Sequence, residues 1–260
     1  MKTFLCVGLD PSLERLPKCL KDRKNIIYEF NKSIIDSTFE YVCAYKPQIA
    51  HYSAISAEND LELTINYIRD KYPSIPVILD AKRGDIGSTA EMYAKEAFDR
   101  YNVDAVTVNP FLGFDSIKPF VERKDKGIIV LCKTSNPTSS EIQDQTIDGK
   151  PLFLDLAERA VKEWNYNNNI LFVVGATYPS QMKNIREIAP ENTFLIPGIG
   201  TQGGSIKKVL ENGLRSDGLG VIISASRSII YASDKDNYYE YSAKIAKKYK
   251  LEIEKYWKAK

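Results

Sequence analysis

The chain alternates between short apolar runs and longer segments in which apolar positions recur with a helical period. The apolar runs span residues 4–9, 41–45, 77–79, 105–108, 127–131, 170–174, 193–196 and 219–223. The helical segments span residues 25–39, 57–71, 88–100, 114–122, 152–164, 179–189, 203–212 and 234–250. Near-continuous apolar runs separated by helices are typical of a parallel β-sheet that helices cover. These eight units predict an α/β fold, a single (β/α)8 TIM barrel over residues 1–260, with a doubly wound open sheet as the alternative.

The composition argues against several classes of protein. The 36 basic and 34 acidic residues give a net charge of +2, whereas nucleic-acid binding usually shows as a basic stripe. The lysine-rich stretch 244–260 also contains glutamates and is expected to be the solvated face of a helix. No apolar run reaches the roughly 18 residues of a membrane span. We therefore expect neither a nucleic acid nor a membrane as a partner.

The four cysteines and the single histidine show no metal-ligand or disulfide spacing. We therefore expect reduced, packed thiols in a cytoplasmic protein without a metal site. His51 is expected to have a structural role, because one histidine cannot form a histidine-rich metal site.

A cluster of charged residues follows the third apolar run, which leads directly into Asp80-Ala-Lys82-Arg-Gly-Asp85. If the strand continues through Lys82, its two-residue period places Asp80 and Lys82 on the same face. Charges at the end of a buried strand are costly unless they pair with one another or with a ligand. Taken alone, the cluster fits either a salt bridge at a strand end or a functional site.

Polar residues or glycines follow the other runs as well. They are Asp10, Lys46, Asn109, Lys133 with Ser135, Gly175, the segment 197–204, and Ser226 with Arg227. In a (β/α)8 barrel the carboxyl ends of the strands converge on one mouth, where active sites are built. We therefore expect these residues to surround a single site.

The last two strand ends indicate a phosphate site. The 198–204 loop is rich in glycine, so its backbone N–H groups can approach an anion closely, and it precedes a predicted helix whose N-terminus favours anions. The guanidinium of Arg227 can donate two hydrogen bonds to one phosphate. Phosphate sites in this fold commonly use the loops after the seventh and eighth strands.

Together, these segments resemble the orotidine 5′-phosphate decarboxylase family. The matching segments are Asp80-Ala-Lys-Arg-Gly-Asp-Ile-Gly-Ser-Thr89, Gly8-Leu-Asp10-Pro, Tyr45-Lys46-Pro, Val108-Asn109-Pro110, the 197–204 loop and Ser226-Arg227. They occur in the family's order from residue 8 to residue 227. The Asp-x-Lys-x-x-Asp core is shared with sugar-phosphate relatives. The residues specific to the decarboxylases are Lys46, Ser135, Gln202 and Arg227, and the phosphate loop is similar to that of the longer bacterial and protozoan branch.

The resemblance implies conversion of orotidine 5′-monophosphate to UMP and CO2, the last step of de novo UMP synthesis, without a metal or an organic cofactor. It implies that Lys82 protonates C6 of the pyrimidine, with Asp80 and Lys46 beside it in an array of alternating charges. It also implies a homodimer in which Asp85 completes the array from the second subunit. Ile86 and Thr89 would cross the same interface, Thr89 towards a ribose hydroxyl.

The resemblance also implies the residues that bind the substrate. Asp10 and Lys46 would contact the ribose, and Ser135 would read the edge of the pyrimidine. The phosphate would be held by Gln202, Gly203, Arg227 and the backbone near Ser226. Asn109 would contact the substrate or only shape the floor of the site.

Plainer interpretations compete with several of these roles. Ser88 and Glu91 fit a capping box, which would make Thr89 an ordinary first-turn residue. Asp10 and Ser135 could simply be turn residues. Lys46 could form a surface ion pair, and Gln202 could be a solvent-exposed residue at the start of a helix.

Two other functions fit the pattern. One is a sugar-phosphate aldolase or epimerase, in whose hexulose-phosphate members acidic residues around this motif hold a divalent metal. The other is a barrel that binds a phosphate ligand without catalysis, although simple binding does not require an array of alternating buried charges. The segment 133–150, rich in Ser, Thr, Asn, Asp and Pro, is a long connection of the kind that is often functional.

Overall fold

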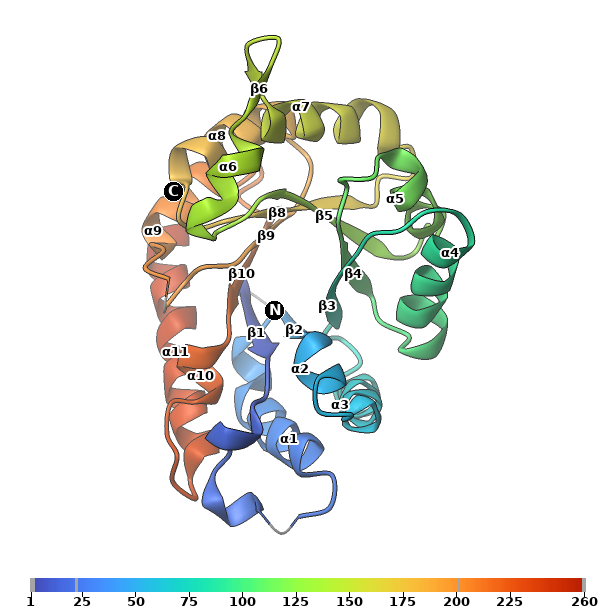
Figure 1. The fold of residues 1–260 in the computed structure, drawn as a ribbon. Helices are drawn as coiled ribbons and strands as arrows, with labels where there is room; N and C mark the ends of the chain where they lie inside the picture. Colours follow the sequence, from blue (N-terminus) through green and yellow to red (C-terminus); the bar gives the residue numbers. More distant parts are fainter. Residues whose placement is uncertain (1–2, 22, 201, 259–260) are drawn as a thin grey trace.

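A computed structural model describes residues 3–21, 23–200 and 202–258. Within them, a sheet of parallel strands has the order β2-β1-β10-β9-β8-β5-β4-β3. Isolated parallel bridges Tyr45–Val77 and Gln48–Asp80 join its two outermost strands, β2 and β3. The sheet therefore closes on itself, and helices surround it (Figure 1). The TIM-barrel prediction is confirmed, and the open-sheet alternative is wrong.

The strands fall close to the predicted runs. The barrel strands are β1 (Leu5–Leu9), β2 (Ala44–Pro47), β3 (Ile78–Arg83), β4 (Ala105–Val108), β5 (Gly127–Lys133), β8 (Ile170–Val174), β9 (Phe194–Ile196) and β10 (Val221–Ala225). Two of them, β2 and β10, begin more than one residue later than predicted. Tyr41 ends a short 3-10 helix before β2, and Gly220, whose φ is +86°, precedes β10.

The helices lie between the strands. The α-helices are α1 (Ile26–Thr38), α2 (Ala50–Ser53), α3 (Glu58–Lys71), α4 (Gly87–Lys95), α5 (Phe114–Val121), α6 (Ser140–Gln143), α7 (Leu152–Arg159), α8 (Pro179–Ile188), α9 (Ile206–Gly213), α10 (Arg227–Ile230) and α11 (Tyr238–Trp257). The short helical turns are η1 (Leu13–Arg15), η2 (Lys18–Leu20), η3 (Phe39–Tyr41), η4 (Glu96–Arg100), η5 (Pro137–Ser139) and η6 (Ala160–Trp164). The predicted helix at 203–212 begins only at Ile206, and the one at 234–250 runs on to Trp257.

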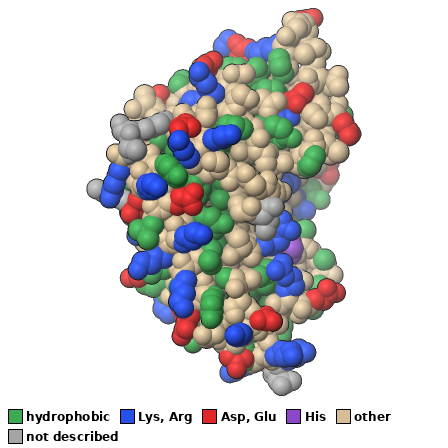
Figure 2. Space-filling view, turned by 90° about the vertical axis from the view of Figure 1, so that its left-hand side faces the viewer, with side chains coloured by type: hydrophobic (Ala, Val, Ile, Leu, Met, Phe, Trp, Pro, Cys, Tyr) green, Lys and Arg blue, Asp and Glu red, His purple; other side chains and the backbone are tan. Residues whose placement is uncertain are grey.

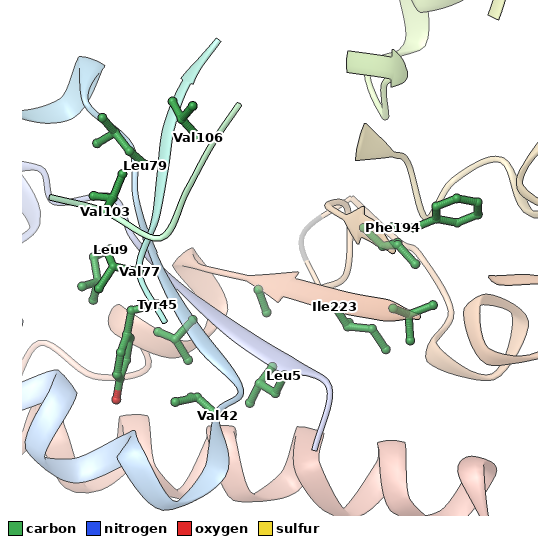
Figure 3. Packing of buried hydrophobic residues seen from close by; sticks show 14 of the residues in the cluster. Leu5, Leu9, Val42, Tyr45, Val77, Leu79, Val103, Val106, Phe194 and Ile223 are labelled. Carbon is green, nitrogen blue, oxygen red and sulfur yellow. The ribbon is translucent and has the colours of Figure 1, made fainter. Parts of the chain in front are cut away.

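Alternate residues of each strand enter two different apolar layers, because side chains of a strand point to opposite faces in turn. The inner layer lies inside the barrel and consists of Cys6, Ala44, Ile78, Ala105, Ile129, Val173 and Leu195. The outer layer packs under the helices. Figure 3 shows Leu5, Val42 and Tyr45 of this layer, and the hydroxyl of Tyr45 donates a hydrogen bond to the carbonyl of Ile35 in α1 (3.0 Å).

The segment 133–150 is folded. It contains η5, α6 and a hairpin of β6 (Thr146–Ile147) and β7 (Lys150–Pro151), which projects beyond α7 in Figure 1. Its base is fixed by the ammonium of Lys133, a fully buried side chain at the end of β5. This group donates hydrogen bonds to Asp144 (2.8 Å) and Ser139 (3.1 Å) and lies 4.5 Å from the ring centre of Tyr178.

The surface view agrees with the balanced composition. Figure 2 shows basic side chains interspersed with acidic ones on the face that carries α9 and α11. Within the described residues, no helix is both long and apolar enough to cross a bilayer.

Candidate active site

The polar site lies directly above the inner apolar layer. Lys46, Asp80 and Thr107 each follow a residue of that layer, two positions further along the same strand. The two-residue period of the strands therefore aims all three side chains into the barrel, towards its carboxyl end. All three are buried.

Asp80 is the centre of this group. Its Oδ2 accepts a hydrogen bond from the ammonium of Lys46 (2.7 Å), and its Oδ1 accepts from the ammonium of Lys82 (2.6 Å) and from the hydroxyl of Thr107 (3.0 Å). The buried carboxylate is thus paired and hydrogen-bonded, which offsets the cost of removing its charge from water. The surface ion pair considered for Lys46 is wrong.

Lys82 reaches Asp80 from an irregular backbone. Its φ is +48°, in the left-handed region, and the pairing register of β3 with β4 shifts between Leu79 and Arg83. At this point the hydroxyl of Thr107 accepts hydrogen bonds from the backbone N–H groups of Ala81 and Lys82, both at 2.9 Å. The side chain of Lys82 is 44% exposed, so its bonded ammonium borders the open mouth of the barrel.

The charges of this group stabilise one another. Burial alone would raise the pKa of the Asp80 carboxyl, but the ammonium groups of Lys46 and Lys82 and their hydrogen bonds hold that pKa well below its usual range. Burial alone would lower the pKa of Lys46, but the carboxylates of Asp80 and Asp10 raise it above its usual value. Asp80 and Lys46 are therefore both ionised at neutral pH.

A cavity of about 190 Å³ connects the charged group with the predicted phosphate loop. It is lined by Asp10, Lys46, Asp80, Pro197, Gly198, Ile199, Gln202, Ser224, Ser226, Arg227 and Ser228. The Oδ1 atom of Asp10 is buried and accepts no hydrogen bond from the described residues. A buried carboxylate oxygen without a donor is costly, so Asp10 is suited to receive a hydroxyl of a bound molecule.

The 198–204 loop forms one wall of this cavity, although its residue 201 lies outside the described residues. Gly204 donates a backbone hydrogen bond to Gly198 (3.0 Å), and a Cβ on Gly204 would lie 2.5 Å from the Cβ of Ala176. Gln202 lies in the loop before α9, whose N-cap is Ser205, so the helix-start interpretation of Gln202 is wrong. Gly203 is exposed and has a φ of +80°, and it donates a backbone hydrogen bond to Gly200 (3.1 Å).

Ser226 and Ser135 lie close to the backbone of neighbouring strand ends. The hydroxyl of Ser226 donates to the carbonyl of Gly8 (3.1 Å), and Arg227 opens α10 beside it. A Cβ on Gly175 would lie 2.8 Å from the Cα of Ser135, and a Cβ on Gly198 would lie 3.3 Å from its Cβ. Glycine at both positions lets Ser135 approach the strand ends that carry the cavity.

The structure does not bring every predicted site residue into the cavity of this chain. Asp85 accepts a hydrogen bond from the N–H of Ile86 (2.8 Å), and among the described residues it forms no ion pair with Lys82. Ile86 and Thr89 are exposed at the start of α4, whose N-cap is Ile86. Ser88 is therefore not the N-cap that the capping box required, but Thr89 does lie in the first turn of the helix. The Oδ1 atom of Asn109 accepts from the N–H of Phe111 (3.0 Å) in a turn.

The sequence did not single out Thr107 or Ser228, and it placed Ser224 at the end of the eighth strand without a role. Thr107 lies inside an apolar run, a pattern that predicts only that it belongs to a strand. A signal was present, since Thr107 and Ser224 occupy the inward positions of their strands by the same alternation that places Asp80. His51 is hydrogen-bonded through Nδ1 to the carbonyl oxygen of Pro11 (2.9 Å), as a structural histidine would be.

A closed parallel barrel with charged groups and a cavity at the carboxyl ends of its strands defines a (β/α)8-barrel enzyme. The model of the orotidine 5′-phosphate decarboxylase / HUMPS family matches residues 3–241. An orotidine 5′-phosphate decarboxylase of Cellvibrio japonicus is 51% identical over 246 residues, which cover 94% of this chain and 90% of that protein. The chain belongs to the orotidine 5′-phosphate decarboxylase / HUMPS family.

Solved structures agree. The chain is similar to Leishmania donovani OMP decarboxylase with a TM-score of 0.81 and 37% identity, over 96% of this chain and 95% of that one. It is similar to Leishmania donovani UMP synthase with a TM-score of 0.89 and 40% identity. That match covers all of this chain and 55% of the longer UMP synthase chain.

Proposed function

We propose that this protein decarboxylates orotidine 5′-monophosphate (OMP) to UMP and CO2. The observation that carries the proposal is the Lys46–Asp80–Lys82 array, in which one buried carboxylate is bonded to two ammonium groups beside the cavity. Relatives that cover nearly the whole chain at about half identity bear the name of this enzyme, which supports the same reaction. The reaction would take place in the cytoplasm, as the cysteine pattern predicts.

The proposed position of the substrate follows the polar groups of the cavity. The phosphate lies at the 198–204 loop, held by Gln202, Gly203 and Arg227 with the backbone near Ser226. The ribose hydroxyls lie between Asp10 and Lys46, where the buried Oδ1 atom of Asp10 has an open acceptor position. The pyrimidine lies above the charged array, and Ser135 reads its edge.

In the proposed reaction, the bond between C6 and the carboxylate carbon breaks, CO2 leaves, and the electron pair stays on C6. Lys82 then transfers a proton from Nζ to C6 and becomes a neutral amine, which regains a proton from solvent. A positive group aimed at the developing negative charge lowers the barrier. Lysine suits this task because arginine does not release a proton in proteins.

Repulsion between the carboxylates of the array and the leaving carboxylate accounts for part of the rate. At about 4 Å and an effective dielectric constant of about 20, one such contact contributes about 4 kcal/mol. That energy corresponds to roughly three powers of ten in rate. The remainder of the acceleration comes from remote binding of the phosphate, which drives closure of the 198–204 loop and orders the site.

We further propose that the active protein is a homodimer in which Asp85 of the partner subunit completes the array. Lys46, Asp80 and Lys82 alternate in charge, and a carboxylate on the far side of the Lys82 ammonium would continue that alternation. Asp85 forms no ion pair with these groups among the described residues of its own chain. Four apolar residues near it are exposed: Ile86 is 56% exposed, Met92 52%, Phe111 80% and Leu112 49%. Such exposed apolar side chains are suited to burial against a second copy of the chain. Ile86 and Thr89 would cross this interface.

The family model also includes the HUMPS proteins, so a metal-dependent sugar-phosphate enzyme is the second candidate. Within the described residues, no group of three or more His, Cys, Asp or Glu side chains is arranged to hold a metal ion. The proposed decarboxylation uses neither a metal nor an organic cofactor, which gives the two candidates opposite responses to chelation.

The test is an absorbance assay of OMP decarboxylation by purified protein in excess EDTA. We expect loss of orotidine absorbance and formation of UMP at the same rate with and without EDTA. Activity that disappears with EDTA and returns with a divalent metal would support the second candidate. Binding of UMP without any turnover of OMP would support a non-catalytic binding protein.

A further inference from the structure

We propose that Tyr249, on the C-terminal helix α11, is a positioning residue that sets the geometry of the phosphate loop. The proposal rests on the proposed function, because it concerns the phosphate group of the same ligand. Tyr249 does not line the cavity. It acts through Ser228, which does line the cavity and which lies, together with the Tyr249 hydroxyl, against Gly200 of the loop.

The contact joins three segments that are distant in the sequence. The hydroxyl of Tyr249 donates a hydrogen bond to the hydroxyl of Ser228 (3.1 Å), the residue after Arg227. Gly200 lies against both groups, since a Cβ on Gly200 would be 2.9 Å from the Tyr249 hydroxyl oxygen and 3.0 Å from the Ser228 oxygen. The φ of Gly200 is +86°, a conformation that side chains other than glycine rarely adopt.

The helix that presents Tyr249 is held firmly. Ser242 donates to the carbonyl of Ile229 (2.8 Å), which ties α11 to α10, and the indole N–H of Trp257 donates to the carbonyl of Gly218 (2.7 Å). Figure 1 shows α11 alongside α10 and α9, the two helices that begin at the phosphate site. The ring of Tyr249 is half-buried against the core. The phenol is therefore held in place where it contacts the loop backbone at Gly200.

This arrangement lowers the cost of binding a phosphate. A loop that donates backbone N–H groups to an anion must be ordered, and ordering costs conformational entropy unless the loop is already in place. The Tyr249–Ser228 pair supplies that order on the side of Gly200. The contribution of the phosphate group to binding should therefore depend on the Tyr249–Ser228 pair. The contribution of the nucleoside part, which binds at Asp10 and Lys46, should not.

The test compares the binding of UMP and uridine by isothermal titration calorimetry. In Tyr249→Phe, which removes only the hydroxyl, we expect the Kd of UMP to rise about threefold to tenfold, the range for loss of one hydrogen bond, with the Kd of uridine unchanged. Tyr256→Phe is the matched control, because Tyr256 is also half-buried on α11, and it should leave both constants unchanged. Equal weakening of both ligands, or no weakening of UMP, would overturn the proposal.

A double-mutant cycle gives an independent test. If Tyr249 acts through Ser228, Tyr249→Phe combined with Ser228→Ala should weaken UMP binding no more than the stronger single substitution. Additive losses would overturn the proposal. Decarboxylation of OMP by the unmodified protein is measured separately, so failure of the proposed function is distinguishable from failure of this role for Tyr249.

Discussion

The hydroxyl of Thr107 donates a hydrogen bond to Oδ1 of Asp80 (3.0 Å), the oxygen that also accepts from Lys82. The same hydroxyl accepts hydrogen bonds from the N–H groups of Ala81 and Lys82, where β3 departs from regular pairing. Thr107 therefore fixes both the carboxylate and the backbone that carries the proposed proton donor. Positioning of this kind matters because small displacements of a catalytic group cost large factors in rate.

We predict that Thr107→Val, which keeps the shape but removes the hydroxyl, lowers kcat for OMP by about tenfold or more. Two partly buried N–H groups lose their acceptor, at up to about 1–3 kcal/mol each, so the melting temperature should fall as well. Thr107→Ser retains the hydroxyl and should keep most of the activity. Steady-state kinetics and thermal unfolding of both variants measure these effects. Normal kcat in Thr107→Val would show that the hydroxyl does not position the array.

Asp80 makes stability depend on acid pH. The pKa of Asp80 is lower in the folded protein than in the unfolded chain. Its ionised form therefore stabilises the fold at pH values above about 3.9, the ordinary pKa of an aspartate carboxyl. That contribution is lost as the pH falls from there through the lowered pKa. We predict that the difference in unfolding free energy between the wild type and Asp80→Asn is largest at neutral pH and shrinks progressively in acid.

Denaturant unfolding at several pH values measures this difference. Asp125→Asn is the control, because the side chain of Asp125 is 81% exposed, and its difference should stay near zero throughout. A difference for Asp80→Asn that is the same at neutral and acid pH would contradict the assignment.

The buried lysine of the 133–150 segment gives a stability prediction. Asp144→Ala removes the only carboxylate that pairs with Lys133 among the described residues. We expect the free energy of unfolding to fall by about 3 kcal/mol, because the buried charge of Lys133 is left without its counter-charge. The control is Glu122→Ala, which breaks an exposed pair with Lys118 (3.8 Å) and should cost less than about 1 kcal/mol. Equal, small losses in denaturant unfolding would show that Asp144 does not anchor the segment.

Periodicity along the sequence predicted the fold better than it predicted contacts between side chains. The barrel and the convergence of its polar strand ends followed from periodicity, because apolar runs identify strands and alternation identifies their inward faces. The meeting of Lys46 with Asp80 was implied by the family resemblance. The role of Thr107 followed from neither, because a threonine within a strand does not show which residue it faces across the sheet.

Contacts between distant segments were harder still to predict. The buried ion pair of Lys133 with Asp144 depends on how an irregular segment folds back on its own strand. The contact of Tyr249 with Gly200 depends on the packing of a helix that local pattern treats only as amphipathic. The positive φ of Lys82 falls where the pairing register of β3 with β4 shifts, and nothing in the identity of a lysine indicates it.

Arg227 tests the phosphate site. We predict that Arg227→Ala raises the KM for OMP by about tenfold to a hundredfold, the range for losing a charge-assisted hydrogen bond, with the fold intact. Lys207→Ala, at an exposed cation on the neighbouring helix α9, should leave the KM within about twofold. Steady-state kinetics and thermal unfolding give both readouts. Unchanged kinetics in Arg227→Ala would refute its role in holding the phosphate.

The most direct test of the shared charge array mixes two inactive variants, Lys82→Ala and Asp85→Ala, under conditions that allow subunits to exchange. Each variant alone should have almost no activity while remaining folded. A mixed dimer would contain one complete site, with Lys82 from one chain and Asp85 from the other. After random exchange of equal amounts, we predict recovery of about a quarter of wild-type activity. Absence of any recovery after demonstrated exchange, or near-normal turnover by Lys82→Ala alone, would contradict the account.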